Sequence, residues 1–262
     1  MKNMNNIVGK SDIIFITLDT LRYDVAQKLW KEGEIPNFSK LLPNTGWEKR
    51  HSPASFTYAS HQAFFAGFLP TKIHEKQERL FATKFEGSET TTTNTFVFNE
   101  ENIVKGFQSI GYETVCIGGV GFFNKKTPLS TVFPKMFNES YWEEKYGVTE
   151  YDSTKFQLEK AIEILENNTK NTFLFINISA LHQPNYFYLD KTKKLDNIET
   201  HTAALKYVDS QLPILIKALE KKKNTFLICC SDHGTTYGED GFYGHRLAHP
   251  KVWNVPYFEK EF

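Results

Sequence analysis

Acidic, histidine and hydroxyl side chains directly follow four of the apolar runs in this chain. Three of these runs are followed by an Asp or a His, which are common metal ligands, and the fourth is followed by hydroxyl groups. The segments concerned are residues 19–24 (DTLRYD), 52–57 (SPASFT), 180–184 (ALHQP) and 231–234 (SDHG). Because ligands bind outside the carboxyl ends of strands in open α/β sheets, this pattern predicts a metal site at one sheet edge.

Asp232 and His233 form the sharpest of these elements. Adjacent side chains diverge inside a strand, but both can turn inward once the strand ends, and Gly234 permits an unusual turn. A simple polar turn explains the same residues equally well. Downstream, residues 238–244 contain three glycines, which predict a tight loop that folds back and returns His245 to the same site.

The elements that must position these residues alternate between strands and helices. Apolar runs predict strands over residues 13–18, 47–52, 114–118, 172–179 and 225–230, and helical spacing predicts helices over residues 99–111, 152–166 and 200–219. Pro213 should kink or break the last helix. The alternation predicts one domain over residues 1–262, a three-layer α/β/α sandwich around a mostly parallel sheet.

Composition excludes several classes of function. The 262 residues carry 31 basic and 31 acidic side chains, so nonspecific nucleic-acid binding lacks its electrostatic basis. No apolar run approaches the ~18 residues of a membrane span, and we read no secretory signal at the polar N-terminus. Cys116, Cys229 and Cys230 match no disulfide or zinc framework. We therefore expect a cytoplasmic protein without a membrane partner.

Five segments resemble the alkaline phosphatase superfamily. SDHG, GEDGFYGH and VWNVPY are similar to its C-terminal signature, closest to the sulfatase-like, phosphodiesterase and phosphoethanolamine-transferase branches. LDTLRYD resembles the opening metal motif, and residues 200–219 resemble the helix before SDHG. The resemblance spans residues 13–257. Among the known branches, the chain looks most like short sulfatase-like proteins encoded beside radical-enzyme peptide-modification systems. The resemblance implies an alkaline-phosphatase-like fold that lacks a large C-terminal subdomain.

The resemblance also places a nucleophile. Sulfatases read C-x-P-S-R-A-A-L-L-T-G-x-x-P, and residues 56–70 (FTYASHQAFFAGFLP) end similarly, with Gly67 and Pro70. Ten positions before Gly67 is Thr57, which phosphodiesterase-like members also carry, and His61 follows four residues later. Without a cysteine the formylglycine of sulfatases cannot form, and a threonine alkoxide suits phosphoryl transfer. A helix N-cap is the alternative role for Thr57, and both roles can hold together.

The implied site contains one divalent metal, zinc or manganese, and an uncertain second one. The first would be bound by Asp19, Thr57, Asp232 and His233. His182 and His245 would bind the second metal, protonate the leaving group or contact substrate oxygens. The carboxylate of a second site is left open between Glu239, Asp240 and Asp209.

Two further residues receive substrate-binding assignments with structural alternatives. His61 either orients the phosphate or packs within its helix, and Arg22 either binds substrate or forms a buried ion pair with Asp24. The loops at residues 73–94, 121–149 and 183–199 are aromatic, and their rings either cover the site as a lid or pack onto the sheet.

The resulting hypothesis is a metal-dependent hydrolase that cleaves a phosphate mono- or diester through a phosphothreonine. Its substrate would be a small-molecule or peptide-linked phosphoryl compound. A phosphomutase or phosphotransferase using the same intermediate is the enzymatic alternative. A metal-stabilised, non-catalytic peptide-binding module is the alternative from another class. The oligomeric state is not predicted.

Overall fold

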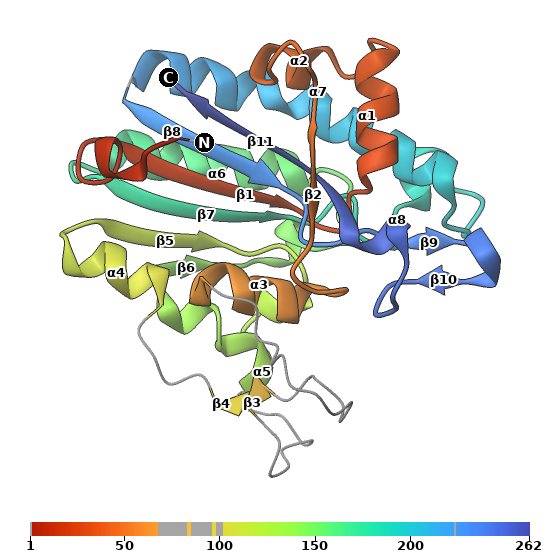
Figure 1. Cartoon of the computed structure of the whole chain (residues 1–262), viewed down its shortest axis with the longest axis horizontal. Coiled ribbons are helices and arrows are strands. Elements are labelled where there is room, and N and C mark those ends of the chain that lie inside the picture. Colours follow the sequence, from red (N-terminus) through yellow and green to blue (C-terminus); the bar gives the residue numbers. More distant parts are fainter. Residues whose placement is uncertain (1, 68–82, 85–95, 98–101, 223) are drawn as a thin grey trace.

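A mostly parallel sheet organises the protein. The computed structural model describes residues 2–67, 83–84, 96–97, 102–222 and 224–262. In this part of the chain seven strands form one sheet in the order β2-β11-β8-β1-β7-β5-β6 (Figure 1). Strands β8, β1, β7, β5 and β6 run parallel, whereas β11 lies antiparallel between β8 and β2. The bounds are β1 Asp12–Leu18, β2 Glu48–His51, β5 Glu113–Ile117, β6 Glu139–Tyr141, β7 Thr172–Ile178, β8 Thr225–Cys230 and β11 Asn254–Glu261.

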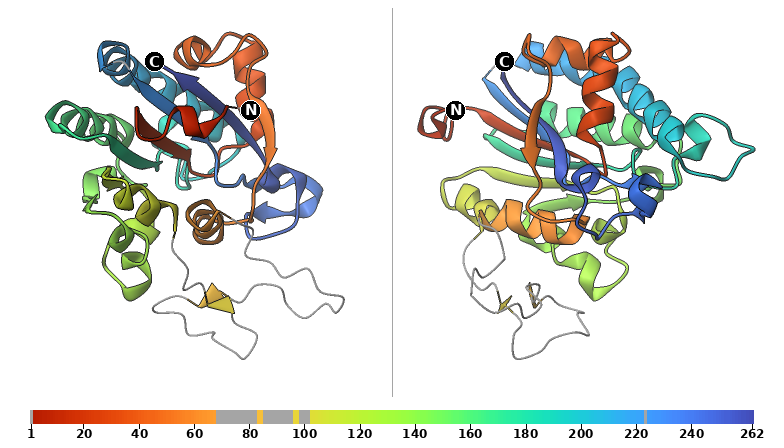
Figure 2. Two further views of the ribbon diagram at one scale, coloured as in Figure 1. Left: turned by 60° about the vertical axis from the view of Figure 1, so that its left-hand side comes forward. Right: turned by 45° about the vertical axis from the view of Figure 1, so that its right-hand side comes forward.

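Helices cover both faces of this sheet (Figures 1 and 2). Helices α1, α2, α6 and α7 pack on one face, and α3 and α4 pack on the other. Their bounds, with those of the short helices α5 and α8, are α1 Tyr23–Lys31, α2 Pro36–Leu41, α3 Thr57–Ala66, α4 Ile103–Ser109, α5 Pro128–Thr131, α6 Ser153–Asn167, α7 Ile198–Lys222 and α8 Pro250–Trp253. The expected three-layer α/β fold with a mostly parallel sheet is confirmed.

Alternation along β1 divides the core into two halves. Ile14, Ile16 and Leu18 join the cluster under α1, α2, α6 and α7, while Ile13 and Phe15 face the opposite cluster. The second cluster is rich in phenylalanine, with Phe65, Phe107, Phe123, Phe133, Phe137, Phe173, Phe175 and Phe226 buried in it. Much of the aromatic content of the chain is therefore core.

All five predicted strands are present, each within one residue of its predicted bounds. The pattern missed β6 and β11, because β6 is short and β11 is interrupted by Pro256 and charged residues. Segment 121–149 contains α5, β6 and short 3-10 turns. Segment 73–94 lies outside the described residues, apart from residues 83–84, which form β3 (Thr83–Lys84) beside β4 (Phe96–Val97).

Helix α7 continues through Pro213, so the expected break is wrong. A proline lacks the N–H that would bond the carbonyl four residues earlier, here that of Asp209. The Asn37 side-chain amide donates to this carbonyl at 3.1 Å and replaces the missing bond. Although α7 has 25 residues, none of the described helices is both long and apolar enough to cross a membrane.

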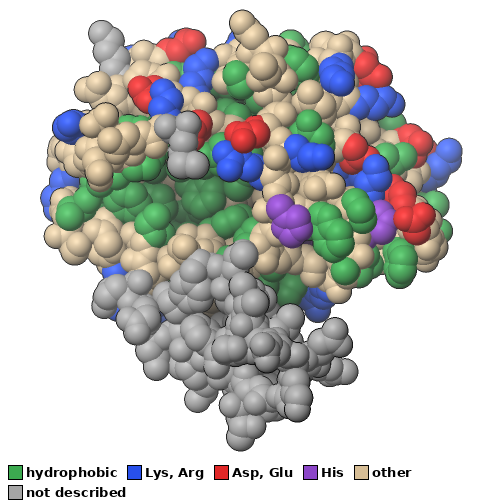
Figure 3. All heavy atoms as spheres, in the orientation of Figure 1, with side chains coloured by type: hydrophobic (Ala, Val, Ile, Leu, Met, Phe, Trp, Pro, Cys, Tyr) green, Lys and Arg blue, Asp and Glu red, His purple; other side chains and the backbone are tan. Residues whose placement is uncertain are grey.

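Charged side chains on the surface are mixed in sign. Figure 3 shows acidic and basic groups interspersed over the described part of one face, as the zero net charge predicts. Many form exposed pairs, such as Lys206 with Glu34 at 2.7 Å. Such pairs contribute little to stability, about 0–1 kcal/mol each.

Candidate active site

Asp19, Asp232 and His233 converge at the carboxyl edge of the sheet. Asp19 follows β1, and Asp232 and His233 follow β8, which is the neighbour of β1. All three side chains are fully buried, and each offers a ligand atom within 4.8 Å of the others. Sheet topology thus assembles three of the four residues expected to bind the first metal.

Each of these groups keeps an atom that can act as a metal ligand. Asn177 Nδ2 donates to Asp19 Oδ2 at 3.1 Å, and Asp19 Oδ1 has no protein partner. Asp232 Oδ1 accepts the backbone N–H of His233 at 3.0 Å, whereas its Oδ2 is also without a partner. His233 Nδ1 donates to the Gly234 carbonyl at 2.8 Å, which leaves a lone pair on Nε2.

The turn after β1 holds this arrangement. Thr20 lies in the left-handed region at φ 63°, which is costly for a β-branched residue. This conformation directs its N–H to Asp232 Oδ1 at 3.1 Å, while its hydroxyl donates to the Leu181 carbonyl at 3.0 Å. The loops after β1, β7 and β8 are therefore connected directly beneath the cluster.

The electrostatics of the cluster favour a bound cation. Burial, and next the Asp232 charge, raise the pKa of Asp19 to about 6. Burial raises the pKa of Asp232 to about 7. A bound divalent cation removes this penalty and favours both ionised forms. Two orphaned carboxylate oxygens and one imidazole lone pair fit zinc or manganese.

Thr57 faces the same cluster from the first turn of α3. Phe56 occupies the N-cap position, so the interpretation of Thr57 as the N-cap is wrong. The Thr57 hydroxyl lies 3.2 Å from His233 Nε2 and 3.5 Å from Asp19 Oδ2. The helix N-terminus behind it favours negative charge at this position.

His61 lies beneath Thr57, away from the open side of the site. Its Nδ1 donates to the Thr57 carbonyl at 2.7 Å, and its Nε2 lies 3.2 Å from the Thr17 hydroxyl. Phenylalanine rings surround it, and burial lowers its pKa to about 3. Both ring nitrogens are occupied, so the geometry favours a role in positioning Thr57 over the expected phosphate contact.

Arg22 forms the buried ion pair that was the alternative to substrate binding. Its guanidinium bonds both carboxylate oxygens of Asp24, at 2.9 and 2.7 Å, and pairs with Glu239 at 2.5 Å. The residue is 2% exposed. This network ties the loop after β1 to the loop after β9 (Thr236–Tyr237), so the geometry favours the structural role of Arg22 over substrate binding.

The three carboxylates considered for a second metal all lie in other interactions. Glu239 pairs with Arg22. The Asp240 side chain is 82% exposed and contacts His249 at 3.1 Å. Asp209 is buried and accepts the Phe38 N–H at 2.7 Å, so it caps α2 and is not solvated. In the described ranges the one cluster of metal-ligand groups is that of Asp19.

His182 and His245 lie at the open side of the cluster. The predicted tight loop is present as the hairpin of β9 and β10 (Tyr243–Gly244), with Gly238, Gly241 and Gly244 at positive φ. It brings the His245 ring to 4.7 Å from the His233 ring and 6.1 Å from the His182 ring. Burial lowers the pKa of His245 to about 3, and His182 Nδ1 donates to the Gln183 carbonyl.

Both histidines line a cavity of about 270 Å³ above Thr57. The other lining residues are Val120, Gly121, Phe122, Thr127, Leu129, Ser130, Val148 and Arg246. Phe122 is the one ring from the three aromatic loops that lines it among the described residues. Phe123, Tyr141, Trp142, Tyr146 and Tyr188 pack on the core instead, and Phe81 and Phe85 lie outside the described residues. For the described parts of these loops, the geometry supports packing rather than a lid.

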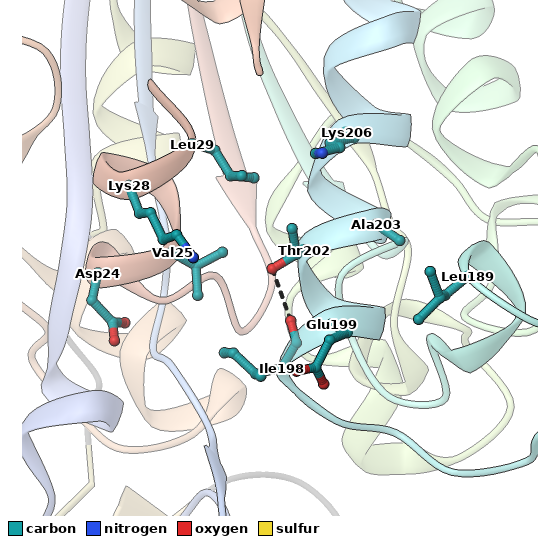
Figure 4. Close-up of a pocket in the computed structure, with 10 residues that line it drawn as sticks. All are labelled: Asp24, Val25, Lys28, Leu29, Leu189, Ile198, Glu199, Thr202, Ala203 and Lys206. Atoms are coloured by element: carbon teal, nitrogen blue, oxygen red, sulfur yellow. Dashed lines mark hydrogen bonds between the residues drawn. The ribbon is translucent and has the colours of Figure 1, made fainter. Parts of the chain in front are cut away.

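A larger cavity of about 430 Å³ lies elsewhere, between α1 and α7 (Figure 4). Its walls are mainly aliphatic, with Lys28, Glu199 and Lys206 around them. The Thr202 hydroxyl is bonded to the Ile198 carbonyl within α7. No histidine and none of the predicted site residues lines this cavity, whereas Thr57, His182 and His245 line the smaller one.

Sequence reasoning missed Asn177 and misjudged Gly234. Asn177 donates to both Asp19 and Thr17 and accepts the Val120 N–H. The available signal was a polar residue inside TFLFINI, a run that is buried along its whole length. Gly234 has an ordinary φ; it is required because a Cβ there would lie 2.0 Å from the Lys251 carbonyl oxygen.

Comparisons with known proteins agree with this architecture. The sulfatase family model matches residues 11–258. The C-terminal periplasmic domain of phosphoethanolamine transferase EptC from Campylobacter jejuni superimposes with a TM-score of 0.64 at 17% identity, covering 96% of this chain and 79% of that one. The corresponding EptC domain from Escherichia coli, in complex with Zn, superimposes with a TM-score of 0.63 at 15% identity, covering 95% of this chain and 72% of that one. Lipoteichoic acid synthase LtaP from Listeria monocytogenes superimposes with a TM-score of 0.63 at 14% identity, covering 99% of this chain and 71% of that one. No curated protein matches the sequence.

Proposed function

The chain belongs to the sulfatase family, whose members act on sulfate or phosphate esters, and we propose from this premise that it is a metal-dependent phosphoric ester hydrolase with Thr57 as nucleophile. One observation carries the proposal: the Thr57 hydroxyl points into a buried cluster of orphaned metal-ligand groups at the floor of a cavity. The absence of cysteine at this position favours phosphorus over sulfur as the centre attacked. The similarity to phosphoethanolamine transferases supports the same choice.

A divalent cation held by Asp19, Thr57, Asp232 and His233 would lower the pKa of the Thr57 hydroxyl and neutralise charge at the site. The protein groups supply the orientation. Asn177 fixes the Asp19 carboxylate, and the Gly234 carbonyl fixes the His233 tautomer. Such supporting hydrogen bonds commonly change metal affinity 10–100-fold. The family match and a Zn-bound structural neighbour support a metal here; its identity is a proposal.

In the proposed reaction the ionised Thr57 Oγ attacks phosphorus, and the bond from phosphorus to the departing ester oxygen breaks. His182, protonated on Nε2, gives its proton to that oxygen. Water then attacks the phosphothreonine, its proton passes to His182, and the P–O bond to Thr57 breaks. Neutral His245 donates a hydrogen bond to a non-bridging oxygen.

Transfer to an alcohol instead of water is the second candidate function. The neighbours named as phosphoethanolamine transferases favour it specifically. The same phosphothreonine serves both reactions, and the group that accepts the phosphoryl decides between them. Adding alcohols of increasing concentration to the assay and measuring phosphorylated alcohol against free phosphate separates the two.

The test combines a substrate panel with matched Thr57 variants. Chromogenic phosphomonoesters and phosphodiesters are incubated with the wild type, Thr57→Ala and Thr57→Ser, each loaded with Mn²⁺ or Zn²⁺. Wild type and the serine variant should hydrolyse the esters, and intact-protein mass spectrometry should detect one phosphoryl group on each. The alanine variant should show neither hydrolysis nor phosphorylation. Undiminished turnover by Thr57→Ala refutes the nucleophile. Metal binding without turnover of any ester would indicate the binding module.

A further inference from the structure

Arg246 is held beside the nucleophile by an unusual backbone conformation. It lies in the left-handed region at φ 70°, which non-glycine residues adopt mainly where the surrounding structure demands it. Its N–H donates to the Ser55 carbonyl at 2.8 Å, and its guanidinium lies 5.1 Å from the centre of the Phe56 ring. Both contacts are to residues that immediately precede Thr57, so the arginine is fixed relative to the nucleophile.

The guanidinium has no anionic partner among the residues that the structure describes. No carboxylate in the described ranges forms an ion pair with Arg246, which is exposed at the cavity. By contrast, Arg22 pairs with two carboxylates. Among the described residues that line the cavity, Arg246 is also the one permanently charged side chain. An unpaired guanidinium facing a cavity is suited to bind an anion.

Part of the cavity lining is apolar. We call Val120, Phe122, Leu129 and Val148 the apolar wall. Two polar residues beside it, Thr127 and Ser130, bond to each other as a capping box of α5 and are already satisfied. A ligand that fills this side of the cavity therefore meets carbon surface, which selects an apolar group.

Charge counting limits the anion. One divalent cation balances the Asp19 and Asp232 carboxylates. Arg246 and the His182 imidazolium of the proposed reaction balance the oxyanion of Thr57 and one further negative charge. The three carboxylates that might have held a second metal lie in other interactions, so the described residues offer no further cation site. A phosphodiester brings one negative charge and a phosphomonoester brings up to two, so the diester is the better match.

We propose that Arg246 binds a non-bridging oxygen of a singly charged phosphodiester whose apolar ester group lies against the apolar wall. This inference rests on the proposed function, because it concerns the substrate of the same cavity. It makes Arg246 a substrate-binding residue, and it makes Phe122 the residue that selects the ester group.

The kinetic test uses three p-nitrophenyl esters with the Mn²⁺-loaded protein: bis(p-nitrophenyl) phosphate, methyl p-nitrophenyl phosphate and p-nitrophenyl phosphate. Arg246→Met should lower kcat/KM for both diesters about 10–100-fold, and Arg246→Lys should recover part of the loss. The control is Arg50→Met, an exposed arginine that also lies over a ring, that of Tyr257; it should leave kcat/KM unchanged. Phe122→Ala should reduce the preference for the aromatic over the methyl diester about tenfold.

A binding measurement separates this inference from the proposed function. Diphenyl phosphate carries one charge and lacks an activated leaving group, so calorimetric titration reports binding alone. If no ester is turned over but binding weakens in Arg246→Met, the anion site stands and the proposed hydrolysis fails. If Thr57-dependent turnover occurs while Arg246→Met changes neither kinetics nor binding, this inference is wrong and the proposed function stands. A wild-type preference for p-nitrophenyl phosphate over both diesters also overturns it.

Discussion

Replacing Asp232 by asparagine should stabilise the metal-free protein at neutral and higher pH. Burial raises the pKa of this carboxyl to about 7, compared with an ordinary value of 3.8. A carboxyl with a raised folded-state pKa contributes stability that is fully present below the unfolded value and is lost as pH rises through about 7. The folded and unfolded pKa values differ by about three, which corresponds to roughly 4 kcal/mol of unfolding free energy.

Other groups oppose this dependence in the wild type. Burial lowers the pKa of His61 and that of His201 to about 3, so the unfolded chain gains protons first as pH falls below 6.5. These histidines therefore cost stability on the acid side. Because they are common to both proteins, the difference between wild type and Asp232→Asn isolates the contribution of the carboxylate.

The assay is urea denaturation in the presence of a chelator, at several pH values from about 4 to about 8. Asp232→Asn should equal the wild type at the acid end and exceed it by up to roughly 4 kcal/mol at the alkaline end. With Mn²⁺ or Zn²⁺ at about 100 times its dissociation constant, the wild type should gain about 2.7 kcal/mol, and the variant should lose this gain. Asp240→Asn serves as the control, since it makes the same substitution at a carboxylate that is 82% exposed and lies outside the cluster.

Two results would refute the reasoning. The first is a difference in unfolding free energy between the two proteins that stays constant over the pH range. It would show that folding does not raise the pKa of Asp232. Equal stabilisation of wild type and variant by metal would show that the cation binds elsewhere.

Three further substitutions test the supporting contacts. Asn177→Leu removes the donor to Asp19 and should weaken metal affinity about 10–100-fold in a Mn²⁺ or Zn²⁺ titration; unchanged affinity would contradict the positioning role. Gly234→Ala places a Cβ against the Lys251 carbonyl and should destabilise the protein by about 2–3 kcal/mol in urea denaturation, whereas a stable variant would show that the loop can yield. Asn37→Ala leaves an α7 carbonyl without a donor and should cost about 1–2 kcal/mol in the same assay, a cost that should vanish if water replaces the amide.

Local patterns were sufficient to predict most of the framework. The parallel strands are continuous apolar runs because they are buried on both faces, and helical spacing indicated α6 and α7. Strand β11 was not predicted from the pattern, because it lies toward the antiparallel edge, where charged residues are tolerated. The continuity of α7 through Pro213 depends on Asn37, which is distant in sequence and has no local signal.

The sequence by itself determined which residue types end the strands, and hence that Asp19, Asp232 and His233 meet at one edge. Only the tertiary structure decided what each polar group does, because a side chain's role depends on which partners already satisfy it. Arg22 and Arg246 are both arginines in segments that resemble the family motifs. Two carboxylates neutralise the first, and the second faces the cavity unpaired. Likewise, burial among phenylalanine rings turned His61 away from the cavity, while the hairpin brought His245 into it.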